Sequence, residues 1–187
     1  NYFLEAIKYI DEKGEVGSEQ WIACARNIGN IYTTTGKTNE AIELYKNILT
    51  YTQNDSESAK IYSLIGNAYS KHGDNENCQK YFEKSLEYYG IYLKVKKIPL
   101  FIDTIKELLI HITHSFTKRS YQHEDQVDEK FEQVCFALHS VTWSYALTNV
   151  YRMFNVTLMT LNITESKGYK SYALFISEMI YACMCMA

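Results

Sequence analysis

The stretch ARNIGNIYTTTGKTNEAIELY, residues 25–45, is followed by YSLIGNAYSKHGDNENCQKYF, residues 62–82, in which one pattern of residues recurs. Each position of the pattern returns 37 residues later, as Gly29 and Gly66 illustrate. The recurring pairs are Ile28 and Ile65, Gly29 and Gly66, Tyr32 and Tyr69, Gly36 and Gly73, Ala41 and Cys78, and Tyr45 and Phe82. Such a period is typical of helical repeats, which bury their apolar faces by stacking. The sequence therefore predicts an all-α protein, an α-solenoid of antiparallel helix pairs.

Composition agrees with long helices, since the chain has one proline, eight glycines and 47% apolar residues. Apolar spacing and capping residues predict a helix over 2–13, one from the N-cap Ser18 to about Gly36, and others over about 39–52, 57–71 and 75–89. The cluster Asn54-Asp55-Ser56 is expected to be a loop, and Asp74 is expected to cap the helix that follows it. Gly29 and Gly66 are expected where two helices approach closely, with Ala41 as the small facing residue.

These residues resemble the tetratricopeptide repeat, a helix-turn-helix unit of about 34 residues. When Gly29 and Gly66 are placed at the family's eighth position, Ile28 and Ile65 fill its Leu site, Tyr32 and Tyr69 its Tyr site, and Tyr45 and Phe82 its later aromatic site. The chain departs from the family pattern at Cys78, Ile48 and Ser85, and at Gln53 and Gly90, where proline is usual. The resemblance covers residues 1–90, as a partial repeat over 2–13 and repeats over about 19–53 and 57–90.

Residues 91–187 are expected to form divergent helices that continue the same solenoid. Pro99 can open a helix with a wide apolar face, made of Leu100, Ile102, Ile105, Leu108, Leu109, Ile112 and Phe116. A polar link over 118–125 precedes a long helical pattern to about Ile163, which we expect to break near Ser140–Ser144, and a last helix is expected from about Tyr169 to Met186. The competing interpretation, a membrane span over 133–151, is disfavoured because six polar side chains interrupt that uncharged stretch.

The resemblance also implies a binding groove, which the first helix of each repeat lines. The predicted partner-binding residues are Arg26, Asn27, Asn30, Lys60, Ser63, Asn67 and Lys71. Asn30 and Asn67 occupy the same place in successive repeats, and an amide side chain can both donate to and accept from a peptide backbone. The alternative is that these asparagines simply fill a solvated face.

Arg26 and Asn30 also resemble the first-repeat half of the carboxylate clamp that some family members use to hold chaperone C-termini. Leu64 stands where the second repeat of that clamp has Asn, so we expect no complete clamp.

Other chemistry is weakly supported by the sequence. His111 and His114 could share a metal with His123 or Glu124, although histidines on a helix are more often packed or solvated. No serine-hydrolase elbow, phosphate loop, dinucleotide fingerprint or H-E-x-x-H motif is present. We therefore expect no catalysis, no metal and no cofactor.

Residues 1–90 carry nine Lys or Arg against thirteen Asp or Glu, and residues 91–187 carry ten against nine. This charge predicts no nucleic-acid partner. Five irregularly spaced cysteines favour a reducing, cytoplasmic compartment, although N-x-S/T triplets at Asn54, Asn155 and Asn162 are compatible with secretion. The chain starts without methionine, inside what looks like a repeat, so we expect a piece of a longer protein.

The sequence thus predicts a non-catalytic module that binds a protein or peptide in the groove of its repeats. Two alternatives stay open. One is a structural subunit that docks or oligomerises through the apolar helices of 133–187, and the other is a fragment of a peptide-sensing signalling receptor.

Overall fold

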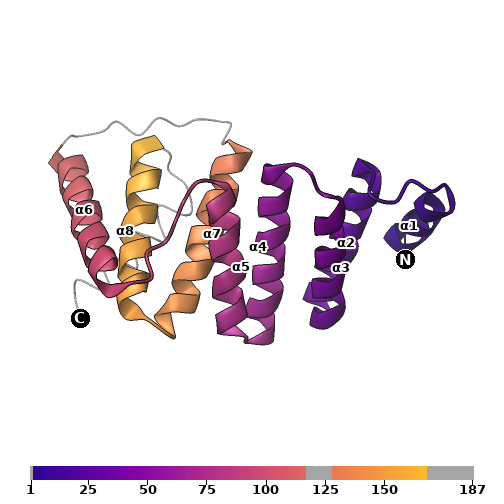
Figure 1. The fold of residues 1–187 in the computed structure, drawn as a ribbon, viewed down its shortest axis with the longest axis horizontal. Helices are drawn as coiled ribbons and strands as arrows, with labels where there is room; N and C mark the ends of the chain where they lie inside the picture. The colour runs from indigo at the N-terminus through magenta and orange to yellow at the C-terminus, as the bar shows by residue number, and fades with distance from the viewer. Residues whose placement is uncertain (1, 117–127, 168–187) are drawn as a thin grey trace. The chain divides into compact units, whose positions relative to one another are not determined.

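The computed structural model describes residues 2–116 and 128–167, which form eight α-helices and no strand (Figure 1). The helices are α1 (Tyr2–Glu12), α2 (Glu19–Thr34), α3 (Thr38–Tyr51), α4 (Asp55–His72), α5 (Asn75–Tyr88), α6 (Lys97–Phe116), α7 (Glu129–Ala146) and α8 (Val150–Lys167). They belong to two compact units, Asn1–Gly90 and Ile91–Ala187. The all-α, solenoid-like architecture is as predicted, because successive helices of the first unit pack on one another. That the second unit continues the same solenoid stays a prediction.

Helix starts in the first unit follow the capping residues that the sequence offers. The Ser18 side chain accepts a hydrogen bond from the Trp21 amide at 3.2 Å, and that of Asp74 accepts one from the Asn77 amide at 3.0 Å. The expected loop at 54–56 was wrong. The Asn54 side chain caps α4, so Asp55 and Ser56 already form its first turn, where the Asp55 carboxylate also suits the helix dipole.

Close packing of α2 on α3 and of α4 on α5 requires Gly29 and Gly66. A Cβ added at Gly29 would lie 2.6 Å from Cζ of Tyr45, and one added at Gly66 would lie 2.9 Å from Cδ2 of Phe82. Both aromatic rings are completely buried. The rings of Tyr45 and Phe82 supply the atoms nearest to the two glycines. Ala41 is fully buried in the same core, and its place opposite these glycines stays a prediction.

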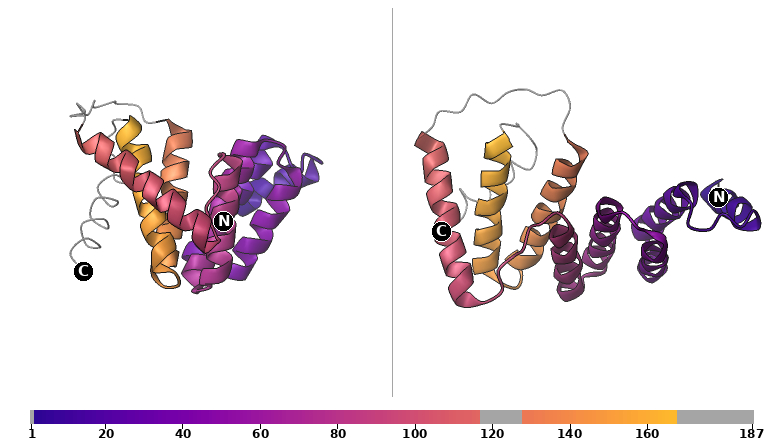
Figure 2. Two further views of the ribbon diagram at one scale, coloured as in Figure 1. Left: turned by 60° about the vertical axis from the view of Figure 1, so that its left-hand side comes forward. Right: turned by 45° about the horizontal axis from the view of Figure 1, so that its top comes forward.

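In the second unit, α8 lies between α6 and α7 and packs on both (Figures 1 and 2). The expected break at Ser140–Ser144 was wrong: α7 runs to Ala146, and the turn falls at Leu147–Asn149. The Asn149 side chain accepts a hydrogen bond from the Arg152 amide at 3.1 Å and so caps α8. About half of the apolar side chains of 133–167 are buried, whereas large exposed ones are Phe136, Trp143, Leu147, Val150 and Tyr151. Within the described ranges, no helix combines the length and the apolarity that crossing a membrane requires.

Helix α6 packs with the face opposite to the one predicted. Ile102, Ile105, Leu109 and Ile112 of its apolar face are exposed, whereas Leu100 is buried. Polar side chains of α6 meet polar side chains of α8 instead. Asn155 donates to Asp103 Oδ2 at 3.1 Å and to Thr104 Oγ1 at 3.2 Å, and Asn162 donates to the carbonyl and the Oε2 of Glu107 at 2.8 and 2.7 Å. These partners allow α6 to bury its polar side, although the Oδ1 atoms of Asn155 and Asn162 are buried without a hydrogen-bond partner among the described residues.

The contacts of Asn155 and Asn162 with α6 also determine whether these two N-x-S/T asparagines are accessible for glycosylation in the folded unit. Asn155 and Asn162 are 1% and 5% exposed, and each side-chain nitrogen donates to α6. The nitrogens that glycosylation would modify are therefore engaged inside the folded unit, whereas Asn54 is exposed. The predicted polar link at 118–125, with His123 and Glu124, and the predicted helix from Tyr169 to Met186 lie outside the described residues.

Candidate partner-binding face

Two rows of side chains, one on α2 and one on α4, define the candidate face. The row on α2 consists of Ala23, Asn27, Asn30 and Thr34, and the row on α4 consists of Lys60, Leu64, Asn67 and Lys71. Spacings of four, three and four residues keep each row on one side of its helix. The two helices contact each other directly, because each is the first helix of its repeat. We call these two rows the α2–α4 face.

A cleft of about 530 Å³ opens at the N-terminal ends of the two helices. Its wall consists of Gly17, Glu19, Ile22, Ala23, Arg26, Tyr51, Thr52, Gln53, Asn54 and Glu57. Ala23 belongs both to the cleft and to the α2 row, so the hollow and the α2–α4 face are continuous. A chain segment that lies along the face can therefore enter the cleft at one end.

Arg26 joins the two helices across the cleft. One of its Nη atoms lies 2.8 Å from Oε1 of Glu57, and Lys60 Nζ lies 4.0 Å from the other oxygen of the same carboxylate. The Arg26 charge is thus largely neutralised, and it does not present the isolated cation that a carboxylate clamp needs. Sequence reasoning missed Glu57 because residue 20, its counterpart one period earlier, is Gln, so no recurrence marks it.

The two groove asparagines differ in their surroundings. Oδ1 of Asn30 accepts a hydrogen bond from the Tyr45 hydroxyl at 2.7 Å. Burial raises the pKa of that hydroxyl, so it stays protonated and keeps donating. The residue that corresponds to Tyr45 in the second repeat is Phe82, which has no hydroxyl. The half-buried Asn67 side chain accordingly forms no hydrogen bond with any other described residue, and both ends of its amide are available.

Two further predicted residues, Asn27 and Ser63, have different environments. Asn27 donates to the Ala23 carbonyl of its own helix at 3.0 Å, so its amide is partly satisfied there. The Ser63 side chain is 2% exposed and lies 2.8 Å from the hydroxyl of Ser85, which in turn donates to the Ala59 carbonyl. Ser63 is therefore a packing residue between α4 and α5.

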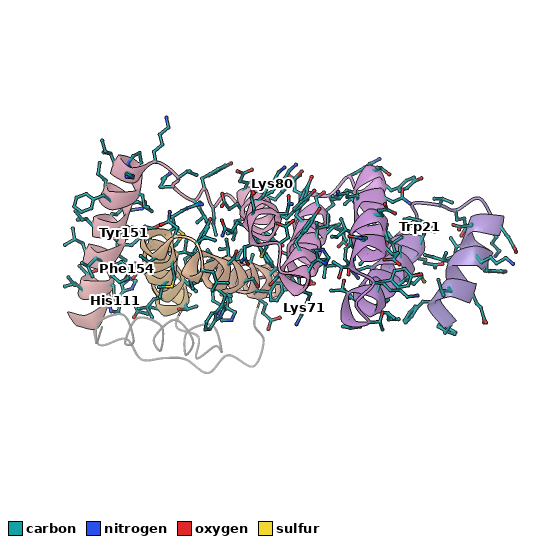
Figure 3. All side chains as sticks on the ribbon, turned by 90° about the horizontal axis from the view of Figure 1, so that it is seen from below. Trp21, Lys71, Lys80, His111, Tyr151 and Phe154 are labelled. Carbon is teal, nitrogen blue, oxygen red and sulfur yellow. The ribbon has the colours of Figure 1, made fainter. Side chains whose placement is uncertain are left out.

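Lys71 is exposed near the C-terminal end of α4. It forms no ion pair with a described residue. In Figure 3 it lies on the side of the α4–α5 pair opposite to Lys80 of α5. The α2–α4 face and the outer side of α5 are thus distinct surfaces.

His111 and His114, which the sequence suggested as metal ligands, both contact the carboxylate of Glu165. Nδ1 of His114 lies 2.8 Å from Oε2 of Glu165, and Nδ1 of His111 lies 3.3 Å from Oε1 of the same carboxylate. This contact joins α6 to α8, where Figure 3 shows His111. Sequence spacing gave no signal for Glu165, because it lies far away in the chain. Among the described residues, no group of three acidic, His or Cys side chains could hold a metal ion.

Comparison with known proteins adds one positive finding. A family model described as tetratricopeptide repeat matches residues 27–55 and 59–90. These two segments contain Asn30, Lys60, Asn67 and Lys71. Neither the curated proteins nor the solved structures include a match to the chain.

Proposed function

Because residues 27–55 and 59–90 of this chain are tetratricopeptide repeats, we propose that its first unit binds an extended segment of a partner protein along the α2–α4 face. Repeats of this family are generally protein–protein interaction modules and are typically non-enzymatic scaffolds. In this proposal the chain acts by binding and not by catalysis. The partner segment runs along the rows of α2 and α4 and ends in the cleft beside Arg26.

The observation that supports this proposal most is the Asn67 amide. A carboxamide that offers one acceptor and one donor can pair with the N–H and the C=O of an extended backbone, whatever the partner's side chains. Oδ1 of Asn30 already accepts a hydrogen bond from Tyr45, so one of its two acceptor positions is taken before a ligand binds. Asn67 therefore provides the open amide, and Asn30 provides a partly occupied one.

The charges along α4 indicate where the proposed ligand should carry an acidic residue. Glu57 is shared by Arg26 and Lys60 near the cleft, whereas Lys71 is exposed at the other end of the row. The eleven residue steps from Lys60 to Lys71 span about 16 Å of helix, which equals roughly five residues of extended peptide. We expect a preferred ligand to place an acidic residue beside Lys71, although the first unit as a whole carries more acidic than basic residues.

Selection from a phage-displayed library of random peptides, followed by calorimetry on the best binders, tests the proposal. Replacing Asn67 by Ala removes two hydrogen bonds to the peptide, each worth about 0.5–1.5 kcal/mol, and should weaken the Kd by about tenfold. The matched control is Asn47→Ala, which removes an exposed amide from α3, away from the face. Equal affinity of the two variants, at unchanged Tm, would refute the role of Asn67.

A further inference from the structure

The helices α6 and α8 begin at the same end of the second unit. Asn155, early in α8, donates to Asp103, early in α6, whereas Glu165, late in α8, contacts His114, late in α6. The two helices therefore run in the same direction. The turn between α7 and α8 lies at this end too, because it leads directly into α8 (Figure 1).

Large apolar side chains are exposed at this end of the unit, on both sides of the contact between α6 and α8. Each of them is more than half exposed. They are Leu147 in the turn, Val150 and Tyr151 at the start of α8, Ile98 and Phe101 at the start of α6, and Val95 just before α6. Figure 3 looks at the protein from below, onto this end, and shows Tyr151 there. Such a patch of large apolar side chains marks a surface that binds a partner or a membrane.

The charge at this end of the unit is positive. Lys94, Lys96 and Lys97 are exposed, and residues 91–102 contain no Asp or Glu. Residues 133–163 contain none either, so the turn and the start of α8 add no negative charge. The first carboxylate of α6, that of Asp103, accepts the hydrogen bond from Asn155. We call the three lysines and the six apolar residues together the basic end of the second unit.

This combination of residues favours a lipid surface over a protein as the occupant. Lysine is depleted in protein–protein interfaces. At a membrane surface, lysine keeps its ammonium group in water beside anionic headgroups, while large apolar and aromatic side chains enter the interface. Trp143, which is exposed one turn before the end of α7, is also of a residue type that is enriched at that depth.

We propose that the basic end of the second unit docks on a membrane surface that contains anionic lipids. The three lysines attract the headgroups, and side chains such as Leu147 and Phe101 enter the boundary between headgroups and acyl chains. Each lysine contributes about fivefold in affinity, which corresponds to about 1 kcal/mol. Docking weakens as the salt concentration rises, because salt screens this attraction. The proposal concerns the second unit and does not depend on the α2–α4 face.

Sedimentation of the full 187-residue chain with vesicles tests the proposal. Vesicles of phosphatidylcholine and phosphatidylserine in equal parts should bind the chain, and vesicles of phosphatidylcholine alone should not. Replacing Lys96 and Lys97 by Gln should weaken binding by about 30-fold. The matched control replaces Lys46 and Lys80, two exposed lysines of the first unit, by Gln and should leave binding unchanged.

Three results of the sedimentation would overturn the proposal. They are no binding to the mixed vesicles, equal binding to both kinds of vesicle, and an equal loss of binding in the two double variants. The control lowers the net charge of the chain by the same amount, so a difference between the variants reports the position of the lysines and not the total charge.

The two tryptophans of the chain report whether the basic end enters the lipid. Trp143 is 54% exposed, whereas Trp21 is 4% exposed in the core of the first unit. Docking should shift the emission of Trp143 to shorter wavelength and allow brominated acyl chains to quench it, and Trp143→Phe should abolish both changes. Unchanged emission from vesicle-bound chain would overturn the proposed entry of apolar side chains.

A pair of tyrosine variants tests the apolar part of the surface. Tyr151, at the start of α8, is 77% exposed, and Tyr2, at the start of α1, is 78% exposed, so neither variant should lose its fold. Tyr151→Ser should weaken vesicle binding severalfold, whereas Tyr2→Ser should not. Size-exclusion chromatography without vesicles tests the competing occupant. A dimer of the native chain that Tyr151→Ser abolishes would overturn the proposal in favour of a second copy on this surface.

Discussion

Gly29→Ala tests the closest helix contact in the first unit. An added Cβ would lie 2.6 Å from Cζ and 3.0 Å from Oη of Tyr45, whose ring is completely buried and cannot swing into water. Overpacking of this kind costs about 1–3 kcal/mol. The displaced ring would also strain the hydrogen bond to Asn30, which is worth about 0.5–1.5 kcal/mol.

Two effects oppose each other in this variant. Replacing glycine by alanine inside a helix stabilises by about 1 kcal/mol, and the clash outweighs that gain. We expect a net loss of roughly 1–3 kcal/mol in the free energy of unfolding. Because a change of 1 kcal/mol shifts the Tm of a unit the size of Asn1–Gly90 by roughly 4–8 °C, the Tm of this unit should fall by several degrees or more.

Urea and thermal unfolding, followed by circular dichroism, measure this loss. Tyr45→Leu in the Gly29→Ala background removes the atoms that the new Cβ meets, so the two substitutions together should cost less than the sum of their separate costs. If Gly29→Ala left the stability unchanged or raised it, the reasoning would be refuted. Helix propensity, and not the contact with Tyr45, would then determine how this substitution changes the free energy of unfolding.

Three other predictions concern single groups. Tyr45→Phe should free the Asn30 amide without unfolding the chain, and should tighten binding of peptides selected on the α2–α4 face, as calorimetry would show. Burial lowers the pKa of His139, whose Nε2 accepts the Trp143 indole N–H at 3.1 Å. As the pH falls, the unfolded chain therefore takes up this proton before the folded chain does, so the free energy of unfolding should fall below about pH 6.5. Urea titrations of the native protein and of His139→Asn at about pH 7.5 and 5.5 measure the difference. Burial, and to a smaller extent the charge of Glu132, raises the pKa of Cys135 to about 12, so iodoacetamide at neutral pH should label this thiol only after unfolding, as peptide mass spectrometry would detect.

The repeats could be predicted from the sequence because their signals are local. Gly29 and Tyr45 lie within one helix pair, and their spacing returns unchanged in the next pair. The different surroundings of Asn30 and Asn67 also had a signal, since the hydroxyl of Tyr45 is missing from Phe82. Repeat symmetry alone conceals that difference, because it treats the two asparagines as equivalent.

Other features depend on contacts that no periodicity records. Ser63 was expected on the binding face, but its hydroxyl pairs with Ser85 of the neighbouring helix, which only the fold brings close. In α6, the spacing of Ile102 and Leu109 indicated an amphipathic helix, but not which side α8 would contact. The turn between α7 and α8 had an available signal in Asn149, a good N-cap residue, whereas the serines at 140 and 144 carried no such capping role.

The polar contact between α6 and α8 fixes the register of the two helices. Apolar surfaces tolerate a slide of one turn at little cost. A slide here would separate the half-buried Asp103 carboxylate and the buried Glu107 carboxylate from the amides of Asn155 and Asn162. Asn155 and Asn162 lie seven residues apart on α8, and both of their amide–carboxylate hydrogen bonds can form in only one alignment of α8 against α6. Replacing all four partners by apolar residues of similar size should keep the second unit helical and stable while allowing α8 more than one alignment against α6.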